Sequence, residues 1–191
     1  PRAFGNRSGN SVSVSPYAFI NRTHSDKSVM TAISHEGPLG VMANKLEEFG
    51  YKDLKEKGSK EFADAKGWLG FTDKYWLTAF IPAANTSFKA TFSHYVSKDV
   101  DRYQADYLGT AKTVAAGASE NFTTRFFAGA KEINELDAYT AGKKGGEPIP
   151  LFDRAVDFGV LYFLTKPFFL ALDGFYALIG NFGIAILLLT I

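Results

Sequence analysis

Cysteine is absent from the 191-residue chain. Without thiols the protein has no thiolate metal site, no cysteine nucleophile and no disulfide framework. The absence also argues against a small eukaryotic ectodomain, because such domains often depend on disulfides for stability. The length allows one domain of ordinary size together with an additional segment.

An excess of either charge is also missing, since 21 basic side chains balance 20 acidic ones and leave a net charge of +1. A nucleic-acid partner would need a clustered basic surface, so we expect none. The histidines His24, His35 and His94 lack the spacing of metal ligands, and no pair of carboxylates can be assigned to one site. We therefore expect no metal, no cofactor and no catalytic residue.

Aromatic residues are abundant, with 18 Phe and 9 Tyr, and many of them lie in short runs typical of β-strands. The clearest run is 87–96, where Phe88, Ala90 and Phe92 alternate with polar residues, as in a strand that buries one face. Further strands are expected at 12–14, 17–20, 29–34, 75–81, 102–107 and 122–128. Residues 46–54 suit a strand or a short charged helix, and we favour the strand.

Two changes of pattern follow the strands. Ile133, Leu136 and Tyr139 are spaced three apart, which predicts one face of a short helix within residues 131–139. Residues 141–150 are rich in Gly, Lys and Pro, which predicts a flexible linker. Residues 1–140 should therefore form a mainly β domain that ends in a short closing helix.

The end of the chain is nearly free of charge, since Lys166 and Asp173 are the only charged side chains in 158–191. Such a composition is that of a membrane segment. We expect residues 151–180 to form a helical segment in the membrane interface that is broken at Pro167, because proline removes an amide donor and clashes with the preceding turn. Lys166, beside this proline, is expected to extend its amine to the interface.

Residues 181–191 are expected to begin a transmembrane helix. Asn181 is a good N-cap for a helix that starts with Phe182 and Gly183. A membrane span needs about 20 residues, and about half of that number remains before Ile191. The chain also begins Pro-Arg-Ala, without an initiator Met or a signal peptide. Both ends lead us to expect a fragment of a longer protein.

Several motifs stand out along the chain. Near the C-terminus they are Asp-Arg-Ala-Val-Asp-Phe-Gly at 153–159, Phe-Leu-Thr-Lys-Pro-Phe at 163–168 and Gly-Asn-Phe-Gly at 180–183. Upstream they are the aromatic strand at 67–82, which ends in Ala-Phe-Ile-Pro, and Phe-Phe-Ala-Gly-Ala-Lys at 126–131. Together these motifs resemble the YidC/Oxa family of membrane protein insertases, in particular its Gram-negative bacterial members. The resemblance extends over most of the chain.

This resemblance implies that residues 1–140 are the C-terminal part of a periplasmic antiparallel β-supersandwich. The whole would belong to an insertase of the bacterial inner membrane that takes nascent membrane proteins into the lipid bilayer, alone or beside the Sec translocon. Such an insertase carries out no bond chemistry, and most of its core would lie beyond Ile191. The residues implied at the membrane interface are Phe163, Lys166, Phe168, Phe169, Phe175 and Tyr176.

A different class of function also fits these features. The chain could be a membrane-anchored periplasmic β-sandwich that binds carbohydrate or peptide, with the apolar end as its anchor. Trp68, Trp76 and Phe80 could then line a binding cleft, although packing in the core of a sandwich is the more common role of such residues.

Overall fold

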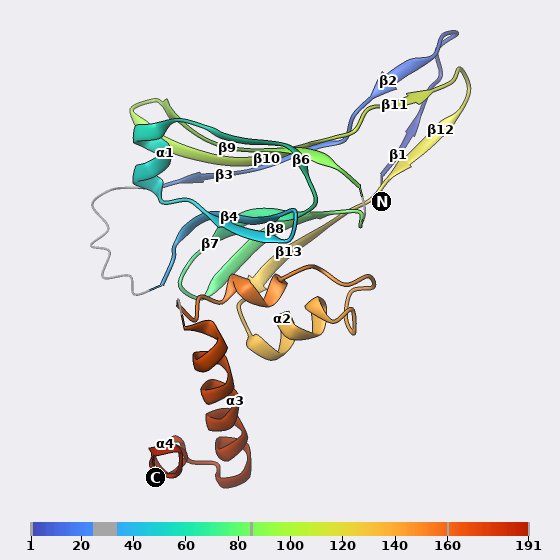
Figure 1. Cartoon of the computed structure of the whole chain (residues 1–191). Coiled ribbons are helices and arrows are strands. Elements are labelled where there is room, and N and C mark those ends of the chain that lie inside the picture. Colours follow the sequence, from blue (N-terminus) through green and yellow to red (C-terminus); the bar gives the residue numbers. More distant parts are fainter. Residues whose placement is uncertain (1, 25–33, 85, 160, 191) are drawn as a thin grey trace. The chain divides into compact units, whose positions relative to one another are not determined.

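A computed structural model describes residues 2–24, 34–84, 86–159 and 161–190 (Figure 1). The chain divides into two compact units, residues 1–155 and 156–191. The first unit is mainly antiparallel β-structure and the second is helical, which confirms the predicted mainly β fold with helices at its C-terminal end. The strand predicted at 29–34 falls almost wholly outside the described residues.

Two antiparallel sheets dominate the first unit. The first sheet has the strand order β3-β10-β9-β6, and the second has the order β13-β8-β7-β4-β5. The strands of the first sheet are β3 (Tyr17–Thr23), β10 (Val100–Gly109), β9 (Phe88–Ser97) and β6 (Lys60–Ala65). Those of the second are β13 (Thr124–Ala130), β8 (Trp76–Pro82), β7 (Gly67–Thr72), β4 (Gly37–Met42) and β5 (Lys45–Glu48).

The facing sides of the two sheets form the main core. Phe88, Ala90 and Phe92 of β9 are all buried, which confirms the face predicted from their alternation. They pack with alternate residues of β10 and with Leu69 and Phe71 of β7. Burying large apolar side chains from both sheets in one layer is the main source of stability for such a sandwich.

A third layer covers the other side of the second sheet (Figure 1). It consists of α2 (Ile133–Thr140) and the 3₁₀ helix η1 (Phe152–Ala155). The predicted helix at 131–139 is thus present. Leu136 of α2 and Phe152 of η1 are fully buried, as is Trp68, which projects from β7 toward this layer.

An arm of two short ribbons extends from the sandwich (Figure 1). One ribbon pairs β1 (Arg2–Gly5) with β12 (Ser119–Phe122), and the other pairs β2 (Val12–Val14) with β11 (Lys112–Val114). The side chain of Asn6, which is buried, donates hydrogen bonds to the carbonyls of Val114 (2.9 Å) and Ala115 (3.0 Å). These bonds hold the two ribbons of the arm together.

The structure corrects the assignment of residues 46–54. A strand, β5, ends at Glu48, and α1 (Tyr51–Lys57) follows it. Tyr51 and Leu54 are buried three residues apart, while Lys57 Nζ lies 2.7 Å from Asp53 Oδ1 on the exposed side. A helix places such residues on two faces, which a strand cannot do at this spacing.

The structure also corrects the assignment of residues 141–155. They do not form a flexible linker followed by the start of an interfacial helix. Trp68 Nε1 donates to the carbonyl of Pro150 (2.9 Å), and the guanidinium of Arg125 donates to the carbonyl of Glu147 (2.8 Å). Ile149 and Phe152 are buried. These contacts with distant strands attach the segment to the second sheet, so the first unit continues to Ala155.

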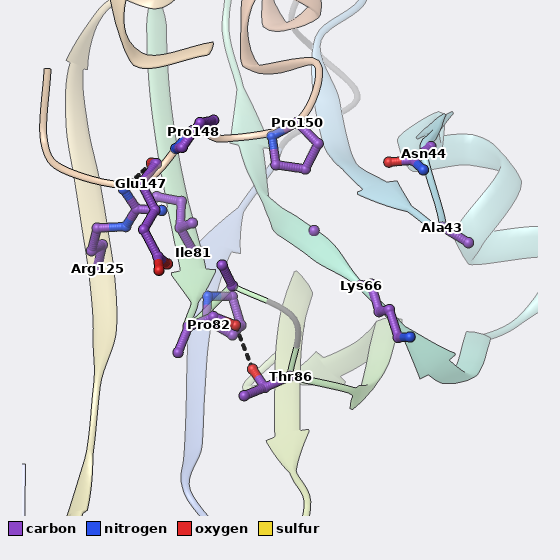
Figure 2. A pocket seen from close by; sticks show the side chains of 13 residues that line it. Ala43, Asn44, Lys66, Ile81, Pro82, Thr86, Arg125, Glu147, Pro148 and Pro150 are labelled. Carbon is purple, nitrogen blue, oxygen red and sulfur yellow. Dashed lines mark hydrogen bonds between the residues drawn. The ribbon is translucent and has the colours of Figure 1, made fainter. Parts of the chain in front are cut away.

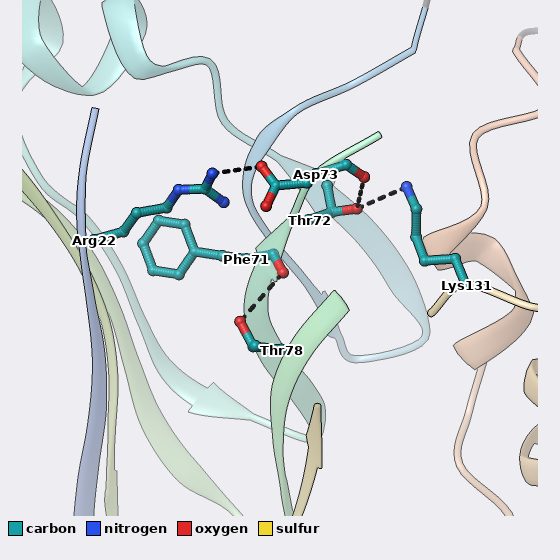
Figure 3. A network of polar contacts seen from close by, with 6 residues as sticks. All are labelled: Arg22, Phe71, Thr72, Asp73, Thr78 and Lys131. Atoms are coloured by element: carbon teal, nitrogen blue, oxygen red, sulfur yellow. Dashed lines mark hydrogen bonds and ion pairs between the residues drawn. The ribbon is translucent and has the colours of Figure 1, made fainter. Parts of the chain in front are cut away.

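A polar network connects the two sheets with Lys131, which directly follows β13 (Figure 3). Arg22 of β3 forms an ion pair with Asp73 at the end of β7 (2.5 Å). Lys131 Nζ donates to the hydroxyl of Thr72 (2.9 Å), which in turn donates to the carbonyl of Asp73 (3.1 Å). Thr72 is almost completely buried, and these bonds offset the cost of removing its hydroxyl from water.

Tyr51 lies near this network and provides a test of the core at high pH. Burial raises the pKa of its phenol from 10.0 to about 12, although the charge of Arg22 partly opposes the shift. The folded state therefore favours the neutral phenol. The resulting stability is fully present below pH 10 and is lost as the pH rises through about 12. Replacing Tyr51 with Phe should remove this part of the loss of stability at alkaline pH.

The measurement is denaturant unfolding of the wild type and of Tyr51→Phe in steps from about pH 8 to pH 12. Tyr75→Phe is the matched control, since Tyr75 is 63% exposed and should keep the wild-type pH dependence. Parallel losses of stability in all three proteins would show that the Tyr51 phenol is not shifted by burial.

Candidate functional site

The second unit consists mainly of two apolar helices, α3 (Tyr162–Ile179) and α4 (Phe182–Thr190). No described residue of α3 is buried, and α4 buries only Ala185. Among the described residues, α3 alone is both long and apolar enough to cross a membrane, with a mean hydropathy of 1.2 over 18 residues. An exposed apolar surface of this extent is typical of a site for lipid or protein.

The helix α3 is continuous through Pro167, so the predicted break at this residue is wrong. Pro167 lies in the second turn, where its missing amide would have bonded to the carbonyl of Phe163. A single absent hydrogen bond near the start of a helix does not end it when the surrounding positions favour helix. The helix also begins at Tyr162 and not at residue 151, where the expected helical segment starts.

Side chains on α3 segregate into two faces. Lys166 and Asp173 are seven residues apart and share a stripe with Tyr162, Phe169 and Tyr176. Lys166 Nζ lies 5.5 Å from the centre of the Tyr162 ring, within range of a cation–π contact. Most of the remaining positions are apolar, and the side of the helix away from Lys166 carries Leu164, Pro167, Phe168, Ala171, Leu172, Phe175, Leu178 and Ile179.

The turn between α3 and α4 is formed as the sequence predicts. Gly180 ends α3 in the left-handed conformation (φ 71°), which glycine adopts without strain. The side chain of Asn181 accepts hydrogen bonds from the amides of Gly183 (2.9 Å) and Ile184 (3.3 Å), so it caps α4. The rings of Tyr176 and Phe182 stack at 3.9 Å across the turn.

The expected membrane-interface residues all lie on α3, and all are at least partly exposed. Phe163, Phe168, Phe169 and Tyr176 are exposed, whereas Lys166 and Phe175 are partly covered. The structure therefore presents these side chains on the surface of the second unit. Their contact with lipid stays a prediction.

The residues of the first unit that the structure describes include no evident cluster of metal-ligating side chains. No group of three or more His, Asp or Glu side chains among the described residues could hold a metal ion. His94 Nε2 lies 2.6 Å from Asp101, while His35 Nε2 lies 3.2 Å from the carbonyl of Pro38. Each of these histidines thus has a local structural partner.

A comparison with family models decides the assignment. Residues 3–171 match the model described as the YidC periplasmic domain. The chain belongs to the YidC family. Its similar proteins include three named "Membrane protein insertase YidC", from Rickettsia bellii (40% identical), Rickettsia canadensis (40%) and Rickettsia akari (38%). Each is matched over 187 residues, which is 97% of this chain and 33% of the relative.

The chain thus spans about a third of the length of the YidC relatives that it matches (33%). The family model covers the whole β-rich unit and the first half of α3. The match assigns this region to the periplasmic part of an inner-membrane YidC protein, which agrees with the localisation expected from the motifs. The YidC relatives are named for membrane protein insertion and not for an enzymatic reaction.

The three aromatic residues considered for a ligand cleft do not form one in the YidC domain. Trp68 is fully buried and donates its indole N–H to Pro150, so its role is structural. Trp76 is 60% exposed at the start of β8. Phe80 packs against the main core, with its ring 5.9 Å from that of Tyr107.

A pocket of about 570 Å³ lies at one end of the sandwich, between the turn that joins β4 to β5 and the segment that follows α2 (Figure 2). Its charged lining residues are Lys66, Arg125 and Glu147. The guanidinium of Arg125 is engaged by the carbonyls of Gly145 and Glu147. No aromatic residue lines this pocket, so it lacks the stacking surface typical of carbohydrate sites.

Proposed function

We propose that this chain serves a membrane protein insertase of the bacterial inner membrane. It would supply the periplasmic domain, a helix at the membrane surface and the start of the membrane core. The substrates would be hydrophobic segments of nascent membrane proteins, received alone or together with the Sec translocon. The observation that supports this proposal most is the match of residues 3–171 to the YidC periplasmic domain. The exposed apolar helices that follow supply the membrane contact it requires.

The two faces of α3 favour a position in the membrane interface. A spanning orientation would place Asp173, near the middle of the helix, in hydrocarbon at a cost of about 2.5–3.5 kcal/mol. An interfacial orientation keeps Lys166 and Asp173 at the level of the headgroups and buries Phe168 and Phe175. The aromatic rings along α3 would then form a belt at the depth where such rings are enriched.

The helix α4 carries no charge and would enter the bilayer, starting at Asn181, Phe182 and Gly183. The turn at Gly180 and Asn181 allows a change of direction between a surface helix and an inserted one. In this arrangement the β-rich unit lies on the periplasmic side. An insertase needs no bond chemistry, because a polar path through the bilayer lowers the cost of moving unpaired polar groups across hydrocarbon.

Depletion of the protein in its own cells tests this proposal. A reporter membrane protein with one hydrophobic segment should remain uninserted and sensitive to cytoplasmic protease after depletion, and a family-length copy should restore insertion. A secreted protein without a membrane segment is the control and should be exported as before. Unchanged insertion of several single-span reporters after complete depletion would contradict the proposal.

A membrane-anchored module that binds carbohydrate or peptide is the other class of function that the sequence allows. Trp68 is buried, and the pocket of about 570 Å³ has no aromatic residue among those that line it, so neither supplies a stacking surface for a sugar. If depletion left insertion intact, sugar and peptide binding to the β-rich unit would be the next measurement.

A further inference from the structure

The turn that joins β7 to β8 presents three exposed residues in a row, Lys74, Tyr75 and Trp76. They follow the buried Thr72 and precede the buried Leu77. Tyr75 (63%) and Trp76 (60%) are both more than half exposed. Lys74 Nζ lies 5.1 Å from the centre of the Tyr75 ring, within range of a cation–π contact. We call these three residues the aromatic tip.

The backbone of the aromatic tip is fixed by contacts with three parts of the first unit. The amide of Asp73 donates to the carbonyl of Trp76 (2.8 Å). The amide of Lys131, which follows β13, donates to the carbonyl of Tyr75 (2.9 Å). Arg22 of β3 holds the carboxylate of Asp73 (Figure 3). The two exposed rings are therefore presented by a preorganised turn, so that little conformational entropy is lost when they bind.

Tryptophan, tyrosine and lysine together are typical of protein surfaces at the boundary between water and lipid. Trp and Tyr combine an apolar ring with one polar group, and they are enriched at the level of the lipid headgroups. Lysine extends its amine into water and is attracted to anionic headgroups. Trp and Tyr are also common in protein–protein interfaces, but lysine is depleted there. Lys74 within the aromatic tip therefore favours lipid as the partner.

The path of the chain keeps the first unit within reach of a membrane. The YidC assignment places this unit on the periplasmic side of the inner membrane. The unit ends at Ala155, and the apolar helix α3 begins seven residues later, at Tyr162. Seven residues span at most about 25 Å when fully extended. The surface of the first unit near Ala155 can therefore touch a membrane that α3 contacts.

The aromatic tip is close to this end of the first unit. Phe152 of η1, three residues before Ala155, has its ring 5.1 Å from that of Trp68 in β7. Thr72, the last residue of β7, is four residues beyond Trp68, which corresponds to about 13 Å along a strand. The aromatic tip follows directly. The tip and the point where the chain leaves the unit thus lie at comparable distances from η1.

We infer that the aromatic tip is a second membrane contact of this protein, in the lipid headgroup region. Tyr75 and Trp76 enter the interface, and Lys74 stays at the level of the headgroup phosphates. The inference rests on the proposed membrane contact of α3 and adds a site in the first unit. Two contacts joined by a short tether bind more strongly than either alone, because binding of the first raises the effective concentration of the second.

Tryptophan fluorescence tests this contact without a label. The chain has two tryptophans, and Trp68 is fully buried, so the difference between the wild type and Trp76→Phe reports on Trp76. The 191-residue chain is bound to vesicles of phosphatidylethanolamine and phosphatidylglycerol, with or without bromine on the acyl chains close to the headgroups. Bromine should lower the emission of Trp76 at least about two-fold, because interfacial side chains reach about 5–10 Å into the boundary between headgroups and acyl chains. Iodide in the water should have little effect on it.

The matched control moves the exposed tryptophan to another part of the first unit, by Trp76→Phe together with Tyr17→Trp. Tyr17 is 53% exposed, and it lies at the opposite end of β3 from Arg22, which contacts Asp73 beside the tip. A tryptophan at position 17 should be quenched by iodide and not by bromine. Bromine quenching of equal strength at positions 17 and 76 would overturn the inference, because it would show unspecific adsorption of the unit.

Two other results at position 76 would also overturn the inference. Quenching by iodide alone would place the aromatic tip in water, and protection from both quenchers would show that protein covers it. Vesicle flotation separates this inference from the proposed function. A chain that floats with the vesicles while bromine leaves Trp76 unquenched would refute the contact of the tip alone. A chain that stays off the vesicles would refute both this contact and that of α3.

Discussion

Replacing Phe152 with Ala is expected to lower the free energy of unfolding of the β-rich unit by about 3–5 kcal/mol. Phe152 is fully buried, and its ring lies 5.1 Å from Trp68 and 5.2 Å from Phe127, edge to face in both pairs. The substitution removes these contacts and leaves a cavity beneath η1. It would also release Pro150, whose carbonyl binds the Trp68 indole.

Denaturant unfolding followed by tryptophan fluorescence measures this effect, because buried Trp68 is one of only two tryptophans in the chain. Phe163→Ala is the matched control. Phe163 is 74% exposed on α3, so its loss should change the stability of the β-rich unit by less than about 0.5 kcal/mol. If Phe152→Ala destabilised the unit as little as the control does, residues 141–150 would be the flexible linker that their composition predicts.

At residues 141–155 the composition predicts the irregular backbone correctly, but it does not predict how the segment packs. Gly, Lys and Pro mark irregular backbone, and the segment is irregular up to η1. Its attachment depends on Trp68, which lies 82 residues from Pro150 in the chain and meets it only in the folded protein. Local patterns carry no information about such a pair. The attachment of residues 141–155 to the second sheet was therefore not predictable.

Elements governed by local rules were predicted best. The alternation in β9 predicted the strand and its buried face, because that face meets the opposite sheet. Gly180 and Asn181 predicted the boundary between α3 and α4. A left-handed glycine that ends one helix and a side chain that caps the next act within a few residues, so local sequence is enough to recognise them. The signal for α1 was also present, in the spacing of Tyr51 and Leu54 between Gly50 and Gly58, but a strand was preferred.

The sequence identified the apolar stretch that forms α3 and α4, because a stretch with few charges is recognisable without tertiary contacts, and the contact of its aromatic residues with lipid stays a prediction. The sequence did not identify the continuity of α3 through Pro167. The continuity matters for the proposed membrane contact, because it keeps Phe168 and Phe175, which are seven residues apart, on one uninterrupted face. A break at Pro167 would have rotated the two halves independently and left each too short to bind a membrane firmly.

Replacing both Phe168 and Phe175 with Ser in a peptide of residues 161–180 is expected to weaken its binding to anionic lipid vesicles about a hundred-fold or more. Burying a Phe side chain contributes about 1.5–3 kcal/mol, and each factor of ten in affinity corresponds to about 1.4 kcal/mol. The matched control replaces Phe169 and Tyr176, which lie on the stripe of Lys166, with Ser. Rings on that stripe stay near the headgroups, so their loss should weaken binding less than about ten-fold. Vesicle flotation or a fluorescence titration measures both affinities. Equal losses for the two pairs would mean that α3 contacts lipid all round, as a spanning helix does, and would contradict its position at the membrane surface.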